Sequence, residues 1–250
     1  MIVVIDGTGP DPAHKPTRIE TARELVRGKL AETRVGAYLI GEKLPPPKSY
    51  DEEMRGSFCK QIKSVADAIY FRGPTLYGSE TSSIADNAVS EVVAGLREDP
   101  SEEVILAGYS RGGCAAIIAA RRLAHRGIDV DAMFLFDAVD MQGSEMDLSR
   151  TITPNVQFVA HARSARNAAF WARNPVKSRF YFYNTGLSLD GGGGDYTSKS
   201  FVGSHAALGG LPWVDIKEDP ACALAVAGWM SGHLQAHGVA VNLKLIGQSS

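Results

Sequence analysis

The sequence predicts an α/β fold in which a mostly parallel sheet lies between two layers of helices. Short apolar runs, typical of strands buried on both faces, alternate with longer segments of helical periodicity. Aspartate, glycine or serine directly follows several of these runs, as at the carboxyl edge of such a sheet. With 250 residues and 44% hydrophobic residues, the chain can form one domain over residues 1–250.

The predicted elements of the first half begin with a strand at Ile2–Ile5. A helix, a short strand or extended segment, a second helix and a second strand follow it, at 18–33, 35–40, 51–65 and 68–71. Three consecutive prolines at 45–47 predict an open loop. Glycine, serine and threonine make 73–82 another loop.

The second half continues the alternation of helices and strands. Helices are predicted at 83–97, 111–126 and 219–236, and strands at 104–107, 132–136, 156–160 and 179–183. A helical turn is expected near 164–172, and an edge strand or a tail after 238. Residues 184–212 are expected to carry a glycine-rich loop, with four consecutive glycines at 191–194, and a second turn at Gly209-Gly210.

Charge and cysteine content narrow the function classes. A net charge of −2 argues against a nucleic-acid-binding protein, which needs a basic face. Cys59, Cys114 and Cys222 are scattered and lack C-x-x-C spacing, so we expect reduced thiols. We expect no metal and no cofactor.

The N-terminus, M-I-V-V-I-D-G-T-G, lacks a basic segment before its apolar run and predicts a strand, not a signal peptide. No run approaches 18 apolar residues, so no transmembrane helix is expected. We therefore expect a protein that is cytoplasmic where it is made, and secretion without a signal peptide stays open.

The central motif is G-Y-S-R-G, in which Gly108, Ser110 and Gly112 form G-x-S-x-G between a predicted strand and a predicted helix. Such a strand-to-helix turn projects the serine Oγ from the backbone, and a Cβ at either glycine would strike neighbouring backbone. The N–H of Arg111 would lie at the helix N-terminus, where it could bind an oxyanion. The motif thus predicts a nucleophile elbow.

A serine nucleophile needs a base and an acid, which follow it in the chain in this kind of fold. Asp137 ends the strand after the elbow helix and is the first candidate for the acid, with Asp140 in reserve. Asp190 and Asp195 occupy the more usual position, after the last predicted strand, within a glycine-rich loop.

His205 is the candidate base because it lies on a loop after the last predicted strand. Five other histidines are less well placed by the chain order: His14, His125, His161, His233 and His237.

The second oxyanion donor is expected from the loop after the first strand, at Gly7 or Thr8. This D-G-T segment is also found in phosphatases with D-x-D-G-T, but Val4 occupies the position of their nucleophilic aspartate. Neither G-x-x-x-x-G-K nor G-x-G-x-x-G is present, which argues against a nucleotide site.

Five motifs together resemble those of an α/β-hydrolase family of bacteria and fungi that includes phospholipase effectors of type VI secretion. They are D-G-T-G at 6–9, G-Y-S-R-G-G at 108–113, L-F-D-A-V at 135–139, V-A-H-A-R-S-A-R at 159–166 and F-V-G-S-H-A-A-L-G-G at 201–210. The closing L-A-V-A-G-W-M at 224–230 is also similar, so the resemblance spans about residues 2–230.

This resemblance implies an α/β-hydrolase-like three-layer sandwich in which Ser110 is the nucleophile, Asp137 the acid and His205 the base. Gly7 and Thr8 match the family's glycine-rich loop. The chain departs from the family at Ala207, where an aspartate is usual. It also lacks room for the membrane-facing domains of many members, which makes ester hydrolysis better supported than phospholipase activity.

The sequence therefore predicts a serine hydrolase that cleaves carboxylic esters through an acyl-enzyme. The resemblance implies a lipid or phospholipid substrate and transient contact with a membrane surface, and a small-molecule ester is the other substrate class. Loops 41–58 and 185–203 are candidate lids because they are long and rich in glycine or proline. The alternative is a hydrolase-fold binding module without catalytic activity.

Overall fold

The computed structural model describes residues 1–9, 49–65, 68–75, 80–140, 146–165, 169–170, 183–191 and 193–246. The predicted helix at 18–33, the extended segment at 35–40, the triple-proline loop and most of the strand at 179–183 lie outside these residues. So do most of the turn predicted near 164–172 and residues 41–48 of the first candidate lid.

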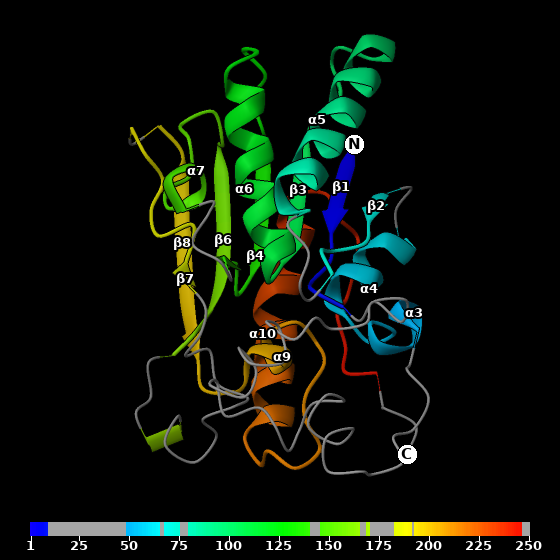
Figure 1. The fold of residues 1–250 in the computed structure, drawn as a ribbon, viewed down its shortest axis with the longest axis vertical. Coiled ribbons are helices and arrows are strands. Elements are labelled where there is room, and N and C mark those ends of the chain that lie inside the picture. Colours follow the sequence, from blue (N-terminus) through cyan, green and yellow to red (C-terminus); the bar gives the residue numbers. More distant parts are fainter. Residues whose placement is uncertain are drawn as a thin grey trace, which may run out of the picture.

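A six-stranded sheet forms the centre of the described fold, with strand order β2-β1-β3-β4-β6-β8 (Figure 1). Every neighbouring pair in it is parallel. The strands are β1 (Ile2–Ile5), β2 (Ile69–Phe71), β3 (Ile105–Tyr109), β4 (Ala132–Phe136), β6 (Phe158–Ser164) and β8 (Asp195–Phe201). The predicted parallel sheet is confirmed.

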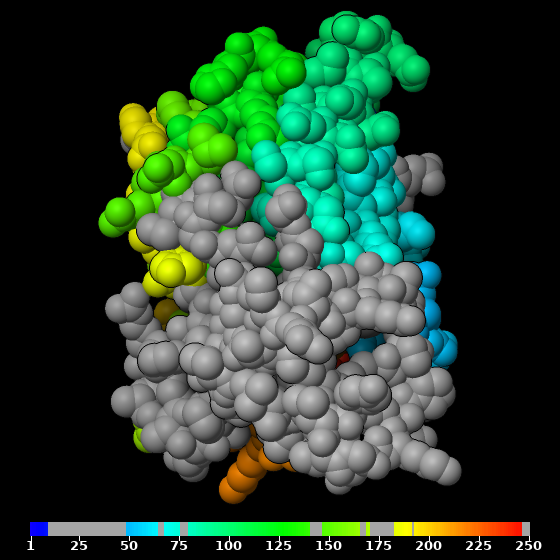
Figure 2. Space-filling view, in the orientation of Figure 1, coloured from blue at the N-terminus to red at the C-terminus, as the bar shows by residue number. Residues whose placement is uncertain are grey.

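Helices cover both faces of this sheet and give it three layers. On one face, α5 (Thr81–Glu98) and α6 (Arg111–Ala124) pack against Val3, Leu106 and Met133. These two helices lie side by side, and Figure 2 shows their surfaces in contact on the near side. On the other face, α4 (Phe58–Val65) and α10 (Asp219–Ala236) pack against side chains that alternate with the first set, such as Ala107 and Phe134. The protein has the α/β-hydrolase type of three-layer fold.

Short helices and an antiparallel strand pair lie outside the central sheet. They are the helices α3 (Tyr50–Glu53), α7 (Met146–Ser149) and α9 (His205–Leu208), and an antiparallel pair of β5 (Val139–Asp140) with β7 (Tyr183–Asn184). Because β7 pairs with β5, the end of the predicted strand at 179–183 is not part of the central sheet.

Residues 184–212 contain a strand and a short helix that were not predicted. Within this segment, β8 pairs with β6 as the edge strand of the sheet and α9 forms a short helix, so 195–201 cannot act as a mobile lid. Most of its side chains, D-Y-T-S-K-S-F, are polar and at least partly exposed. An edge strand of this kind lacks the apolar run that identifies a buried strand.

The predicted helix at 51–65 is two helices, separated by residues 54–57. Ser49 caps the first in a capping box with Glu52. Ser57 starts the second, since its Oγ accepts the N–H of Lys60 at 3.1 Å. A serine that caps a new helix explains the interruption.

Helix α10 offers a test of local stability at Gly228. This glycine is exposed within the helix, and a Cβ there would meet no atom within 4 Å. We expect Gly228→Ala to raise the free energy of unfolding by about 0.8 to 1.0 kcal/mol, because alanine has the higher helix propensity. Urea unfolding measures this change, and Gly112→Ala, which overlaps the Asp6 carbonyl, serves as the opposite case and should destabilise strongly. A loss of stability in Gly228→Ala would contradict the prediction.

Candidate active site

Ser110 lies in the turn between β3 and α6 with φ 58° and ψ −129°, a conformation that L-residues rarely adopt. Hydrogen bonds to the segment around β4 hold the turn: Ser110 N donates to the Phe136 carbonyl at 3.0 Å, and Val139 N donates to the Ser110 carbonyl at 3.1 Å. The neighbouring strand thus fixes the strained residue that presents the hydroxyl.

The two glycines of G-x-S-x-G are required by close backbone contacts. A Cβ at Gly108 would lie 2.6 Å from the carbonyl oxygen of Gly112. A Cβ at Gly112 would overlap the carbonyl of Asp6 at the end of β1. Helix α6 therefore packs directly against the backbone of the sheet, and its first residues lie close to the loop after β1.

Asp137 directly follows β4 and also has a positive φ, 43°. Its N–H donates to the Ala162 carbonyl at 2.7 Å, and its Oδ1 accepts the N–H of Ser164 at 3.0 Å. The side chain is fully buried. Strand β6 thus holds the carboxylate so that Oδ2 faces the carboxyl edge of the sheet.

His205 is the first residue of α9 and links the other two predicted residues. Its Nδ1 lies 2.7 Å from Asp137 Oδ2, and its Nε2 lies 2.8 Å from Ser110 Oγ. A carboxylate can only accept, so Asp137 favours the tautomer with the proton on Nδ1 and leaves Nε2 to accept the proton of Ser110. The structure brings these three residues, 95 positions apart at most, into one hydrogen-bonded chain.

The other candidate acids lie elsewhere. Asp140 is buried in β5, three positions beyond Asp137, but the His205 imidazole is bonded to Asp137. Asp190 Oδ2 accepts the hydroxyl of Thr151 at 2.7 Å, and Asp195 begins β8. The more usual position for the acid, after a later strand, is therefore not the one that faces His205.

The other histidines have structural surroundings, and His14 lies outside the described residues. His161 is buried in β6, where its Nε2 accepts the N–H of Ala138 and its Nδ1 lies 3.2 Å from the Gly186 carbonyl. His125 follows the end of α6, and His233 and His237 pack against aromatic rings at the C-terminal end of α10.

The predicted oxyanion donors need one correction. The N–H of Gly7 donates to its neighbour's carboxylate, Asp6 Oδ1, at 2.8 Å, so it is not directed at a substrate. Thr8 remains the candidate from this loop. Arg111 is the first residue of α6, where backbone N–H groups have no partner within the helix.

Arg111 also contributes its side chain, which the sequence did not predict. Arg111 is only 1% exposed, so its guanidinium needs partners inside the protein. The Nε donates to Thr8 Oγ1 at 2.9 Å, and a terminal nitrogen donates to the Thr75 carbonyl. Burial lowers the pKa of this guanidinium, and the charges of Glu80 and Asp140 oppose that effect. Arg111 therefore ties the elbow helix to the loop that carries Thr8.

Asp6 anchors the same loop, a role that the sequence did not predict. Its Oδ2 accepts the hydroxyls of Ser57 at 2.6 Å and Tyr70 at 2.8 Å. Burial raises the pKa of this carboxyl, against the effect of its hydrogen bonds. Tyr50 completes the arrangement by donating to the Gly7 carbonyl at 2.9 Å.

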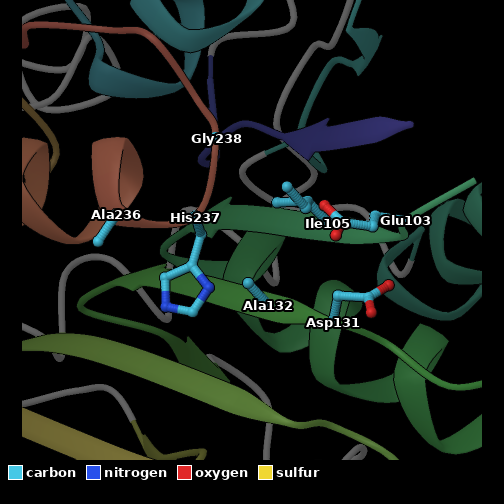
Figure 3. Close-up of a pocket in the computed structure, with 7 residues that line it drawn as sticks. All are labelled: Glu103, Ile105, Asp131, Ala132, Ala236, His237 and Gly238. Atoms are coloured by element: carbon cyan, nitrogen blue, oxygen red, sulfur yellow. The ribbon is translucent and has the colours of Figure 1, made fainter.

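A separate hollow of about 430 Å³ lies at the amino ends of the strands, at the end of the sheet opposite to Ser110 (Figure 3). It lies where β3 and β4 begin, with the imidazole of His237 on one side of Ala132 and the carboxylate of Asp131 on the other. Ser110 and Asp137 follow the ends of the same strands. This hollow therefore takes no part in the chemistry of Ser110.

Among the residues that the structure describes, no cluster of three or more His, Cys, Asp or Glu side chains could hold a metal ion. Within the same part of the chain, no helix has both the length and the apolar character needed to cross a membrane. Cys59, Cys114 and Cys222 are buried free thiols.

Comparison with protein-family models gives a match over residues 45–170 to the thioesterase domain, about half of the chain. The chain belongs to the thioesterase-domain family. The matched span of this thioesterase-domain protein contains Ser110 and Asp137 and ends before His205. Membership makes the protein a hydrolase of the α/β type, while the phospholipase subgroup that the motifs resemble stays a prediction.

Other comparisons add little to this assignment of the thioesterase-domain protein. No curated protein matches the sequence. Among solved structures, a presumed cell surface hydrolase of Lactobacillus plantarum WCFS1 is similar with 8% identity and a TM-score of 0.38, over 94% of this chain and 91% of that one. A similarity of this size has no bearing on substrate or mechanism.

Proposed function

We propose that the protein is a serine hydrolase that cleaves carboxylic esters through an acyl-enzyme on Ser110. The observation that carries this proposal is the hydrogen-bonded chain from Ser110 Oγ through the His205 imidazole to the buried Asp137 carboxylate. Such a chain turns a weakly nucleophilic hydroxyl into an attacking group, because a base accepts its proton as the new bond forms.

In the proposed reaction, Ser110 Oγ attacks the acyl carbonyl carbon while His205 Nε2 takes the hydroxyl proton. The N–H groups of Arg111 and Thr8 would stabilise the oxyanion. The tetrahedral intermediate collapses when His205 returns the proton to the leaving alcohol or thiol, which leaves Ser110 acylated. Water then attacks the acyl group, again with His205 as the base, and releases the acid and free Ser110.

The family match and the shared motifs both bear on the substrate. The family match supports an acyl thioester, and the motifs shared with phospholipase effectors support a lipid or phospholipid ester. Both carry an acyl chain on a carbonyl that Ser110 could attack. A lipid substrate would also require transient contact with a membrane surface. We propose an acyl lipid as the substrate class, with the leaving group to be decided by comparing oxygen esters and thioesters of matched acyl chains.

Reaction with a fluorophosphonate probe tests the proposed function. We expect covalent labelling at Ser110 and loss of labelling after heat unfolding. A protein that is folded, as judged by circular dichroism, but neither labelled nor active on any ester would contradict the proposal. That result would support a binding module without catalytic activity.

The identity of the acid leads to a separate prediction. We expect Asp137→Asn to lower kcat by about 10³ to 10⁴-fold, because an amide at this position can favour the wrong imidazole tautomer. Asp140→Asn is the control and should lower kcat by less than about tenfold. Steady-state kinetics on a chromogenic ester measures both, and a larger loss in Asp140→Asn would move the acid to that residue.

A further inference from the structure

Asp219, the first residue of α10, is a fully buried carboxylate close to the loop that carries His205. Its Oδ1 accepts the N–H of Ser204 at 2.8 Å. Its Oδ2 accepts the Ser204 hydroxyl at 2.5 Å and the N–H of Trp213 at 2.9 Å. One carboxylate thus bonds both sides of the segment that contains α9.

The negative charge of Asp219 is stabilised where it lies. Three donors bond its two oxygens, and hydrogen bonds to an ionised acceptor are stronger than those between neutral groups. Its position at the N-terminus of an 18-residue helix adds a favourable interaction with the helix dipole. The group can therefore act as a fixed anchor inside the protein.

Ser204 connects this anchor to the imidazole. It is the N-cap of α9, its Oγ accepts the N–H of Ala207 at 3.1 Å, and His205 is the next residue. Gly203 brings the backbone against α10 so closely that a Cβ there would lie 2.5 Å from the sulfur of Cys222. The loop therefore has a defined position on the helix, set by Asp219.

The opposite side of the same short segment is held by Tyr109. Its hydroxyl donates to the His205 carbonyl at 3.2 Å, and its ring lies 5.2 Å from the imidazole. The backbone of His205 is thus fixed between the elbow strand and α10.

We propose that Asp219 is a positioning residue for the general base, and that through Ser204 it holds His205 Nε2 within hydrogen-bonding distance of Ser110. This inference rests on the proposed function, since it assigns His205 as the base. Asp219 acts through its bonds to Ser204 and to the backbone of Trp213, and it touches no reacting atom. Displacement of a base by about 1 Å can cost about 100-fold in rate, so such an anchor has a measurable effect.

Asp219→Asn tests the proposal. The amide NH2 would face either the Trp213 N–H or the Ser204 N–H, donor against donor, and would release one side of the loop. We expect kcat for a chromogenic ester to fall by about 10 to 100-fold with KM changed by less than about twofold. Rates are expressed per active site, with sites counted by complete fluorophosphonate labelling.

Asp131→Asn is the matched control. This aspartate also accepts a backbone N–H, that of Val104 at 2.7 Å, but it lies where β4 begins, away from Ser110. We expect kcat per site in Asp131→Asn to equal that of the wild type, even if its melting temperature falls. A role for Asp219 in stability alone would lower the number of titrated sites while kcat per site stays at the wild-type value, and that result would overturn the proposal.

Ser204→Ala provides a second variant if Asp219→Asn does not fold. It removes the hydroxyl that links Asp219 to α9, and we expect kcat per site to fall by about tenfold. If both variants fold, the double variant should lose no more than the worse single variant, because the two residues act in one chain of contacts. A Ser204→Ala variant with wild-type kcat per site would contradict the proposal.

Failure of the proposed function itself would be recognised separately, because the wild-type protein would then be neither labelled nor active.

Discussion

Ser110→Ala is expected to lower kcat for ester hydrolysis by at least about 10³-fold, since it removes the hydroxyl that is proposed to attack the ester and to carry the acyl group. Ser110 is 3% exposed, and its hydroxyl bonds the His205 imidazole. The backbone bonds that hold the turn do not involve the side chain, so we expect the melting temperature to change by only a few degrees. Steady-state kinetics and thermal unfolding together measure the two effects.

Ser231→Ala is the matched control for this experiment. Ser231 is also buried, but its hydroxyl accepts the N–H of Leu243 at 2.9 Å and so joins α10 to the segment that follows this helix. It should lose stability and keep its activity per folded molecule, the reverse of Ser110→Ala. Retention of ester hydrolysis in folded Ser110→Ala would show that the nucleophile is another group.

His205→Ala is the second prediction with a large effect. Without a base to accept its proton, the Ser110 hydroxyl reacts slowly, and we expect kcat to fall by about 10³ to 10⁴-fold. Fluorophosphonate labelling of Ser110 should slow in parallel, because it uses the same proton transfer. Added imidazole should restore part of the activity if it enters the space left by the side chain between Asp137 and Ser110.

His125→Ala is the control, because this histidine caps the C-terminal end of α6 and is exposed. Its activity should equal that of the wild type. Near-native turnover in His205→Ala would require a different general base and would also remove the basis for the proposed role of Asp219.

The elements that could be predicted from the sequence are those that bury an apolar run. The strands Ile2–Ile5 and Ala132–Phe136 and the helix Asp219–Ala236 agree with prediction because periodicity and length identify a buried segment. Strand β8 was missed because its polar side chains at the edge of the sheet resemble those of a loop. Its formation depends on pairing with β6, which a local pattern does not encode.

The three residues of the hydrogen-bonded chain could be predicted from local signals. Ser110 lies in the G-x-S-x-G motif, Asp137 directly follows a buried apolar strand, and His205 was selected by its late position in the chain order. The supporting roles of the Arg111, Asp6 and Asp219 side chains were not predicted. Arg111 and Asp219 are buried ionisable groups, and local sequence gives such residues a surface position by default. Only tertiary contacts, between residues far apart in the chain, show that Asp6 binds Ser57 and Tyr70 or that Asp219 binds Ser204.

The most direct test of an acyl-enzyme on Ser110 is intact-mass spectrometry of the protein, quenched in acid during turnover of a p-nitrophenyl ester. We predict a mass increase equal to one acyl group, located on the peptide that contains Ser110 and absent from Ser110→Ala. Turnover of the ester with no acylated protein, or with the acyl group on another residue, would contradict the proposed mechanism.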